Sequence, residues 1–169
     1  MLVVKVQFHI LDKEHFFLPK FEDQNIKEVK VKDKVIVKTD LGQDLGIIRG
    51  KVDINKDEVE DANQMLRLAN EDDFKKIQNQ KKEYKKYLDI CRNLIRENRL
   101  DMKLVDVHQS FDNKRLTFYF VSNSRIDFRD LVKKLIGIFH KKIRLQQTNI
   151  SDEAKIEGDY GPFYRNIYW

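Results

Sequence analysis

The segment from residue 105 to residue 139, VDVHQSFDNKRLTFYFVSNSRIDFRDLVKKLIGIF, decides the fold class. Residues 105–111 and 116–121 alternate in the manner of strands, and Asp112-Asn113 between them supplies the turn of an antiparallel hairpin. Asp127 predicts the start of a helix. Apolar residues then recur at spacings of three and four and predict the buried side of this helix: Phe128, Leu131, Val132, Leu135, Ile136 and Phe139.

The neighbouring segments extend this pattern on both sides. Asn70 is a favourable N-cap, and the acidic residues after it suit the positive end of a helix that runs to about Asn98. Lys81 interrupts the apolar stripe of this helix, so we expect the turn around it to lie partly free of the core. Residues 143–147 alternate like a strand. The order helix, strand, strand, helix, strand predicts a sandwich with both helices on one face of the sheet.

Residues 1–54 contain short alternating segments and no helical pattern. Gly42 supplies a turn and Gly46 marks a bend or bulge, so we expect a small β-barrel-like sheet. Its strands are predicted at residues 4–10, 16–18, 28–31, 34–39 and 47–52. The predicted class is α+β, a β-barrel-like sheet followed by an α-β-β-α-β sandwich. Its parts are a β subdomain at 1–54, a connector at 55–69, an α+β subdomain at 70–150 and an aromatic tail at 151–169.

Composition and motif content exclude several classes of protein. The longest apolar run, residues 135–139, is far shorter than a bilayer span, and no secretion signal is visible, so a cytoplasmic location is expected. Cys91 is the only cysteine, which excludes an internal disulfide and a cysteine metal cage. The four histidines lack the spacing of zinc ligands. We expect no metal site, no catalytic site and no enzymatic activity.

Basic residues exceed acidic ones, giving a formal net charge of +5, and the excess lies in residues 71–169. A group of cations around the helix of residues 127–139 predicts a surface for phosphates: Arg125, Arg129, Lys133, Lys134, Lys141, Lys142 and Arg144. Tyr119, on the second face of the hairpin, is a candidate for stacking on a base. A solvated helix face and a tyrosine packed between sheets explain the same residues, and both interpretations stay open.

Several motifs together resemble one known family. They are residues 39–46 (TDLGQDLG), 101–106 (DMKLVD), 116–120 (LTFYF), 125–132 (RIDFRDLV), 143–147 and 152–155, with the pairs Phe111-Asp112 and Gly161-Pro162. These motifs resemble those of the RicT/YaaT (stage 0 sporulation) family, which shares the conserved C-terminal region of a yeast polymerase-suppressor protein. The similarity extends over nearly the whole chain and is most specific from Asp101 to Leu131.

The resemblance implies a regulatory protein rather than an enzyme. Bacterial members of this family act with two small helical partners, RicA and RicF, and the complex adjusts messenger-RNA processing by the ribonuclease RNase Y. By this resemblance we expect a non-enzymatic adaptor in RNA processing, with small helical proteins and a ribonuclease as partners and no membrane partner. The alternative is a module that binds RNA or single-stranded DNA directly through the basic helix and Tyr119.

The sequence departs from the family at its cysteine motif. Bacterial relatives follow the Gly-Pro pair with Cys-Gly-Arg and two further cysteines, whereas this chain keeps Gly161, Pro162 and Arg165 and has Phe163, Tyr168 and Trp169 in the cysteine positions. These side chains do not replace cysteine thiolates as ligands of an iron–sulfur cluster, so no such cluster and no other cofactor are expected. The aromatic tail is instead expected to pack on the body or on a partner through Tyr160, Phe163, Tyr164, Tyr168 and Trp169.

Overall fold

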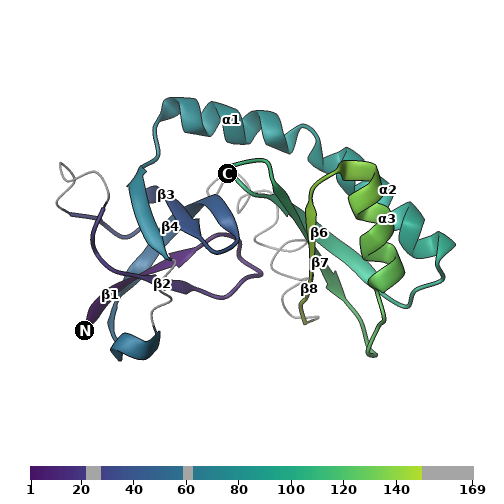
Figure 1. Cartoon of the computed structure of the whole chain (residues 1–169), viewed down its shortest axis with the longest axis horizontal. Helices are drawn as coiled ribbons and strands as arrows, with labels where there is room; N and C mark the ends of the chain where they lie inside the picture. Colours follow the sequence, from purple (N-terminus) through teal and green to yellow (C-terminus); the bar gives the residue numbers. More distant parts are fainter. Residues whose placement is uncertain (22–27, 59–62, 150–169) are drawn as a thin grey trace. The chain divides into compact units, whose positions relative to one another are not determined.

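Figure 1 shows a computed structural model of the chain, in which residues 1–21, 28–58 and 63–149 are described. The chain divides into two compact units. The first unit comprises Met1–Phe74 and Ser110–Asp112, and the second comprises Lys75–Gln109 and Asn113–Trp169. Each unit contains its own β-sheet, and helices cover the sheet of the second, so the predicted α+β class is confirmed.

The first unit contains a five-stranded antiparallel sheet. Its strands are β1 (Leu2–Gln7), β2 (His15–Phe17), β3 (Lys34–Thr39), β4 (Gly42–Asp53) and β5 (Gln64–Leu68). Their order across the sheet is β2-β1-β4-β3-β5, and an isolated bridge between Phe21 and Met65 links its two ends. The described strands thus form a curled sheet that no full ladder closes. A buried apolar cluster packs on it, including Val4, Val6, Phe17, Val37 and Ile48.

β5 lies inside the segment predicted as a connector, so that part of the prediction is wrong. The strand pairs with β3, and Met65 within it is buried in the core of the first unit. Conversely, residues 28–31 were expected to form a strand and do not. Lys32 has a φ angle of 78°, so the chain turns sharply before β3 begins. A short 3-10 helix, η1 (Lys56–Glu58), occupies part of the segment between β4 and β5.

β4 is a continuous strand of 12 residues and begins earlier than the predicted strand at 47–52. Gly46 lies within it opposite Val35, and the β3–β4 ladder passes through this position without a change of register. A Cβ atom at Gly46 would lie 2.3 Å from Cγ1 of Val6. This glycine therefore permits close packing on β1, and the bulge lies instead between Lys5 and Val6 in the β1–β4 ladder.

The second unit contains a three-stranded mixed sheet with two helices on one face (Figure 1). Its strands are β6 (Lys103–Gln109), β7 (Arg115–Val121) and β8 (Lys142–Gln147), in the order β6-β7-β8. β6 and β7 are antiparallel, whereas β7 and β8 are parallel. The helices are α2 (Tyr84–Glu97), which packs over β6, and α3 (Arg129–Phe139), which packs over β8. Their shared core includes Cys91, Leu94, Leu116, Phe118, Leu131 and Leu135.

The long helix predicted from Asn70 to Asn98 is two helices, so this prediction is wrong in its continuity. The first, α1 (Glu71–Lys81), leads from the first unit into the second, and a turn at Lys82 and Glu83 separates it from α2. The break follows the interruption of the apolar stripe at Lys81, which is half-buried. None of the helices in the described parts of the chain is long and apolar enough to cross a bilayer.

α3 begins later than the sequence predicted, and fewer of its apolar side chains are buried. Phe128 is its N-cap residue, whereas Asp127 lies one residue before the cap and accepts a hydrogen bond from the amide of Arg129 at 3.2 Å. Ile136, predicted to be buried, is 43% exposed. The helix packs on the sheet through a narrow apolar stripe centred on Leu131 and Leu135. The prediction of a wider buried stripe that includes Ile136 is wrong.

Candidate partner and nucleic-acid interface

The predicted cations lie on and around α3 and β8, but they do not form one patch. Arg129 and Lys133 are four residues apart and share one side of α3. Lys134 lies about 100° further around the helix and points toward α2, because its Nζ donates to Oδ1 of Asn98 at 2.9 Å. Lys142 and Arg144 lie on β8, two residues apart on the same face of the strand. The structure therefore distributes the predicted cations over a helix side, a helix junction and a sheet edge.

Contacts within the protein hold three of these cations in place. Lys134 bonds to Asn98, Lys141 donates to the backbone carbonyl of Asn113, and Nη2 of Arg144 donates to Oε1 of Gln146 at 2.8 Å. Each of these three acceptors is a neutral amide oxygen, so these hydrogen bonds orient the cations without neutralising them.

Arg129 has a carboxylate partner, Asp127. Its guanidinium makes a bidentate contact with Asp127, with Nη2 to Oδ2 at 2.7 Å and Nε to Oδ1 at 3.0 Å. Hydrogen bonds from the Arg129 side chain and backbone lower the pKa of Asp127 to about 2. Because the pair is fully exposed, solvent screens it, and its main effect is to neutralise one charge of the predicted phosphate surface.

Three predicted cations remain available to a ligand. The side chains of Arg125, Lys133 and Lys142 are exposed and have no hydrogen bond or ion pair with another residue in the described ranges. They come from the loop before α3, the outer side of α3 and the first position of β8. Of the seven cations predicted to bind phosphates, these three are the ones whose side chains remain free of contacts with other described residues.

The interpretation of Tyr119 as a base-stacking residue is wrong for this structure. Its side chain is fully buried within β7, the central strand of the second sheet. Both faces of β7 are covered: Thr117, on the same face as Tyr119, is buried, and so is Phe118 on the opposite face. Alternation identified the strand, but it could not show that the second face is covered as well.

The aromatic tail lies outside the described residues. The predicted partner-binding residues Tyr160, Phe163, Tyr164, Tyr168 and Trp169 all belong to it, so that expectation stays a prediction.

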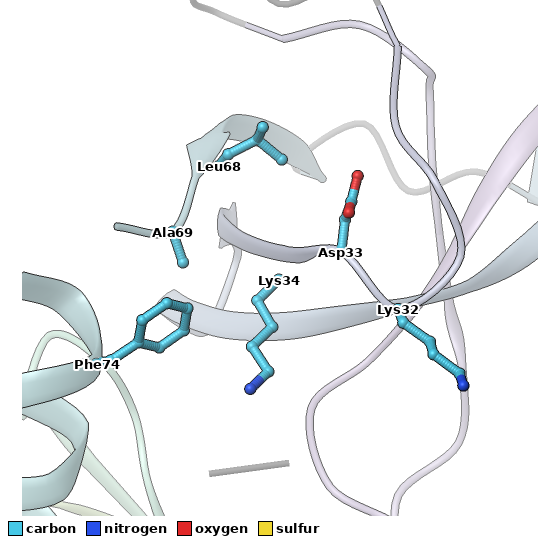
Figure 2. Close-up of a pocket in the computed structure, with 6 residues that line it drawn as sticks. All are labelled: Lys32, Asp33, Lys34, Leu68, Ala69 and Phe74. Atoms are coloured by element: carbon cyan, nitrogen blue, oxygen red, sulfur yellow. The ribbon is translucent and has the colours of Figure 1, made fainter. Parts of the chain in front are cut away.

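The first unit also contains a pocket that the sequence analysis did not predict (Figure 2). It is an open hollow of about 250 Å³, lined by Lys32, Asp33, Lys34, Leu68, Ala69 and Phe74. Nζ of Lys34 lies 5.1 Å from the centre of the Phe74 ring, within the range of a cation–π contact. Partial burial lowers the pKa of Lys34. The lining residues come from two segments, the turn and start of β3 and the β5–α1 junction. These segments are far apart in the sequence, so no motif or spacing could predict that they meet.

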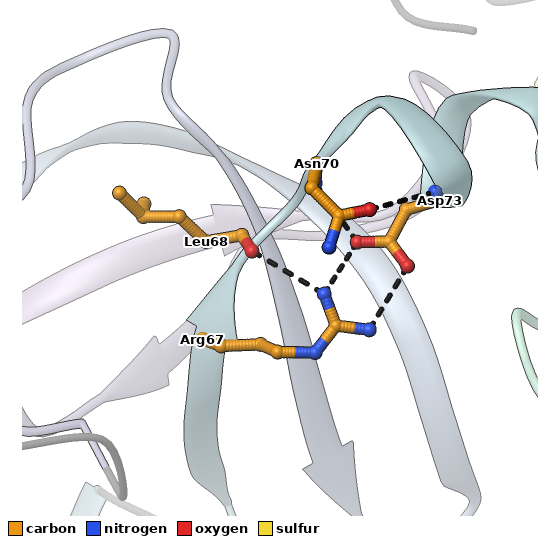
Figure 3. Close-up of polar contacts among 4 residues, drawn as sticks. All are labelled: Arg67, Leu68, Asn70 and Asp73. Atoms are coloured by element: carbon orange, nitrogen blue, oxygen red, sulfur yellow. Dashed lines mark hydrogen bonds and ion pairs between the residues drawn. The ribbon is translucent and has the colours of Figure 1, made fainter.

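The start of α1 is held by a network of polar contacts (Figure 3). Oδ1 of Asn70 accepts from the amide of Asp73 at 3.0 Å, and Oδ2 of Asp73 accepts from the amide of Asn70 at 2.9 Å. This is a reciprocal capping box, so the predicted N-cap is confirmed. Arg67 of β5 adds a bidentate ion pair to the buried Asp73, and this hydrogen bonding raises the pKa of Arg67. The Asp73 carboxylate thus stabilises the start of the helix.

Two of the motifs that carried the family resemblance meet in the first unit. Oδ2 of Asp112 accepts from the amide of Gln43 at 2.9 Å, and Oδ1 accepts from the hydroxyl of Ser110 at 2.7 Å. Gly42 has a φ angle of 106°, and a Cβ atom there would lie 2.6 Å from Oδ2 of Asp112. The TDLGQDLG and Phe-Asp motifs therefore have a structural role, the joining of one turn to another.

A metal ion in a protein needs several His, Cys, Asp or Glu side chains that lie close together. In residues 1–21, 28–58 and 63–149, no group of three or more His, Cys, Asp or Glu side chains could hold a metal ion. Burial raises the pKa of Cys91 to about 12, so its thiol stays protonated and unreactive at neutral pH.

Comparison with known proteins gives one family and three relatives. The model of the PSP1 C-terminal conserved region matches residues 63–148, the stretch from the residue before β5 to the residue after β8. Stage 0 sporulation protein YaaT of Bacillus subtilis is 36% identical over 98% of this chain and 59% of its own length. An uncharacterized protein of Schizosaccharomyces pombe is 27% identical over 83% of this chain and 23% of its own length.

The third relative is Protein PSP1 of Saccharomyces cerevisiae, which is 37% identical over 37% of this chain and 7% of its own length. The chain thus spans about three-fifths of the sporulation protein and a small part of each yeast protein. No solved structure matches the chain.

Proposed function

The chain belongs to the family of the PSP1 C-terminal conserved region, and from this premise we propose that it is a non-enzymatic regulatory adaptor in RNA processing. The similarity to a stage 0 sporulation protein over 98% of the chain supports a regulatory role. The proposed partners are small helical proteins of the RicA and RicF type and a ribonuclease, as the resemblance to the RicT/YaaT family implies.

The outer surface of α3 is the observation that carries an adaptor role. Ile136 is 43% exposed, and the exposed cations Arg129 and Lys133 lie beside it on the helix. Apolar groups bordered by charge are typical of surfaces that bind other proteins, whereas a surface for phosphates alone needs no exposed isoleucine. Three carboxylates have structural partners that suit such a role: Asp73 and Asp112 accept hydrogen bonds from backbone amides, and Asp127 accepts from Arg129.

A pull-down of the tagged chain from its native host tests this proposal. We expect recovery of a ribonuclease together with small helical proteins. Ile136→Asp should reduce this recovery at least fivefold, while Val31→Asp, at a residue 57% exposed in the first unit, should leave it unchanged. If the wild-type chain recovers neither class of protein, the adaptor proposal is wrong.

Direct binding of RNA or single-stranded DNA is the second candidate function. The side chains of Arg125, Lys133 and Lys142 favour it, because they are exposed and no other described residue neutralises them. If Lys133 and Lys142 touch phosphates, each Lys→Ala variant should reduce the slope of log K against log salt by about 0.7 for a single strand. Lys86→Ala, at an exposed position of α2, is the matched control. The absence of measurable binding of labelled RNA at low salt would exclude this function.

A further inference from the structure

The hollow in the first unit brings cationic and apolar side chains together. Its volume is about 250 Å³, and its lining includes two lysines, Lys32 and Lys34, and three apolar residues, Leu68, Ala69 and Phe74. Sites for small molecules usually combine an apolar wall with a few charged groups, and drug-sized ligands occupy roughly 300–1,000 Å³. This hollow therefore suits a smaller molecule that has both a charged and an apolar part.

Lys34 is a half-buried cation in this hollow. Its Nζ lies over the ring of Phe74, 5.1 Å from the ring centre. Burial lowers the pKa of the Lys34 ammonium, and no carboxylate of the described residues lies close enough to oppose that shift. In the described ranges, the ammonium groups of Lys32 and Lys34 have no hydrogen bond or ion pair with another residue. A bound anion would stabilise the charge that burial disfavours.

Asp33, the acidic residue of the lining, does not neutralise these lysines. Its Oδ2 accepts from the amide of Lys30 at 2.8 Å. Figure 2 shows the ammonium groups of Lys32 and Lys34 on one side of the chain and the Asp33 carboxylate on the other. The side that contains the two lysines is therefore positive, and it favours an anion over a cation or a neutral molecule.

The rest of the lining indicates which kind of anion fits. The amides of Lys32, Asp33 and Ala69 already donate to backbone carbonyls at 2.8, 3.0 and 2.9 Å, so they do not form the backbone cradle that phosphates often use. Leu68 is 37% exposed, and a bare anion would leave it in water. A nucleobase would place its ring nitrogens and oxygens against apolar side chains that offer no hydrogen bond. A carboxylate joined to a hydrocarbon body would use both the lysines and the apolar wall.

We propose that this hollow binds a small carboxylate with an apolar body, of the aromatic or branched hydrocarbon class. The carboxylate would pair with the ammonium of Lys34, with Lys32 adding positive charge, and the hydrocarbon would pack against Leu68, Ala69 and Phe74. This site goes beyond the adaptor role proposed above and uses residues of the first unit alone. The pull-down can succeed while ligand binding fails, and the reverse, so the two proposals fail separately.

A titration of the full chain with hydrocinnamate, followed by NMR of the backbone amides, tests the proposal. Hydrocinnamyl alcohol has the same apolar body without the charge, and acetate has the charge without the body. We expect saturable shifts at the amides of the lining residues, and at least tenfold weaker binding of the alcohol and of acetate. The pKa of Lys34, measured by NMR of its side chain, should rise on binding. The absence of saturable shifts at the lining with millimolar hydrocinnamate, or equal affinity for the alcohol, would overturn the proposal.

Variants test the two parts of the site separately. Lys34→Met keeps most of the apolar stem and removes the charge, so it should weaken hydrocinnamate binding at least fivefold. Lys38→Met is the matched control, because Lys38 is exposed on the same face of β3 outside the lining, and it should change the affinity less than twofold. Leu68→Asn alters the apolar wall at an exposed position and should weaken binding at least fivefold. Equal affinities of the Lys34 and Lys38 variants would contradict the role given to Lys34.

Other ligands distinguish the source of the anion. Adenosine monophosphate tests a nucleotide, and an acetylated dipeptide that ends in phenylalanine tests the C-terminal carboxylate of a protein, which offers the same chemistry. We expect both to bind more weakly than hydrocinnamate. Tighter binding of adenosine monophosphate would overturn the carboxylate assignment, and tighter binding of the dipeptide would overturn the assignment to a small molecule. Equal shifts at the amides of α3 and β8 would overturn it in favour of non-specific anion binding.

Discussion

Asp73 shows how one carboxylate can organise a helix start. It is 5% exposed, completes the capping box with Asn70 and receives the guanidinium of Arg67 from β5. The ion pair is only partly desolvated, since the Arg67 side chain is 40% exposed. The carboxylate thus connects the last strand of the first sheet to the helix that follows it.

Replacing Asp73 should therefore destabilise the protein. We expect Asp73→Ala to lower the free energy of unfolding by about 2 kcal/mol, because it removes the capping box and leaves Arg67 without its partner. Asp72→Ala, at the exposed neighbouring position, should cost less than about 0.5 kcal/mol. Urea denaturation measures both values, and equal losses for the two variants would contradict the role given to Asp73.

Asp127 gives a pH-dependent prediction at the scale of a single residue. Its pKa is about 2 in the folded chain against 3.8 in the reference state. A lowered carboxyl pKa stabilises the folded state above pH 3.8, and that contribution is lost as the pH falls toward 2. NMR titration of the Asp127 carboxyl carbon should show the low midpoint, and Arg129→Ala should return it toward 3.8. A midpoint near 3.8 in the wild-type chain would show that the pair does not form.

At the scale of elements, alternation and helical period predicted the second unit well. The β6–β7 hairpin, α3 and β8 follow strong periodic patterns with Asp112-Asn113 at the turn, and all are present. β5 was missed because Gln64–Leu68 is short and follows an acidic polar stretch. It forms a strand because it pairs with β3, a segment about 30 residues away. Local strand propensity carries no information about such a distant contact.

α3 supplies a matched test of which side of the helix is buried. Leu135 is fully buried and its neighbour Ile136 is 43% exposed. Leu135→Ala should cost about 3 kcal/mol of unfolding free energy, because it leaves a cavity in the second core, and Ile136→Ala should cost less than about 1 kcal/mol. Thermal or urea unfolding separates the two. A larger loss for Ile136→Ala would show that the helix is rotated from the position described.

At the scale of the whole molecule, the sequence predicted which residues belong to the candidate site, but it did not predict how they are arranged in space. The sequence identified the cations of α3 and β8, yet it could not show that Asp127 neutralises Arg129 or that Tyr119 is buried. It also could not show the exposure of Ile136, because helical period alone does not fix the width of the buried stripe. The position of β8 at one edge of the described three-stranded sheet follows only from the strand order, which depends on pairing across the chain.

The most direct test of the account is a hydrogen-exchange footprint of the chain bound to its partners from the native host. The account predicts that binding slows amide exchange within residues 129–147, which contain α3 and β8, and leaves β1 to β5 unchanged. Protection confined to the pocket around Lys34 and Phe74, or no protection of α3 and β8 in an intact complex, would contradict it.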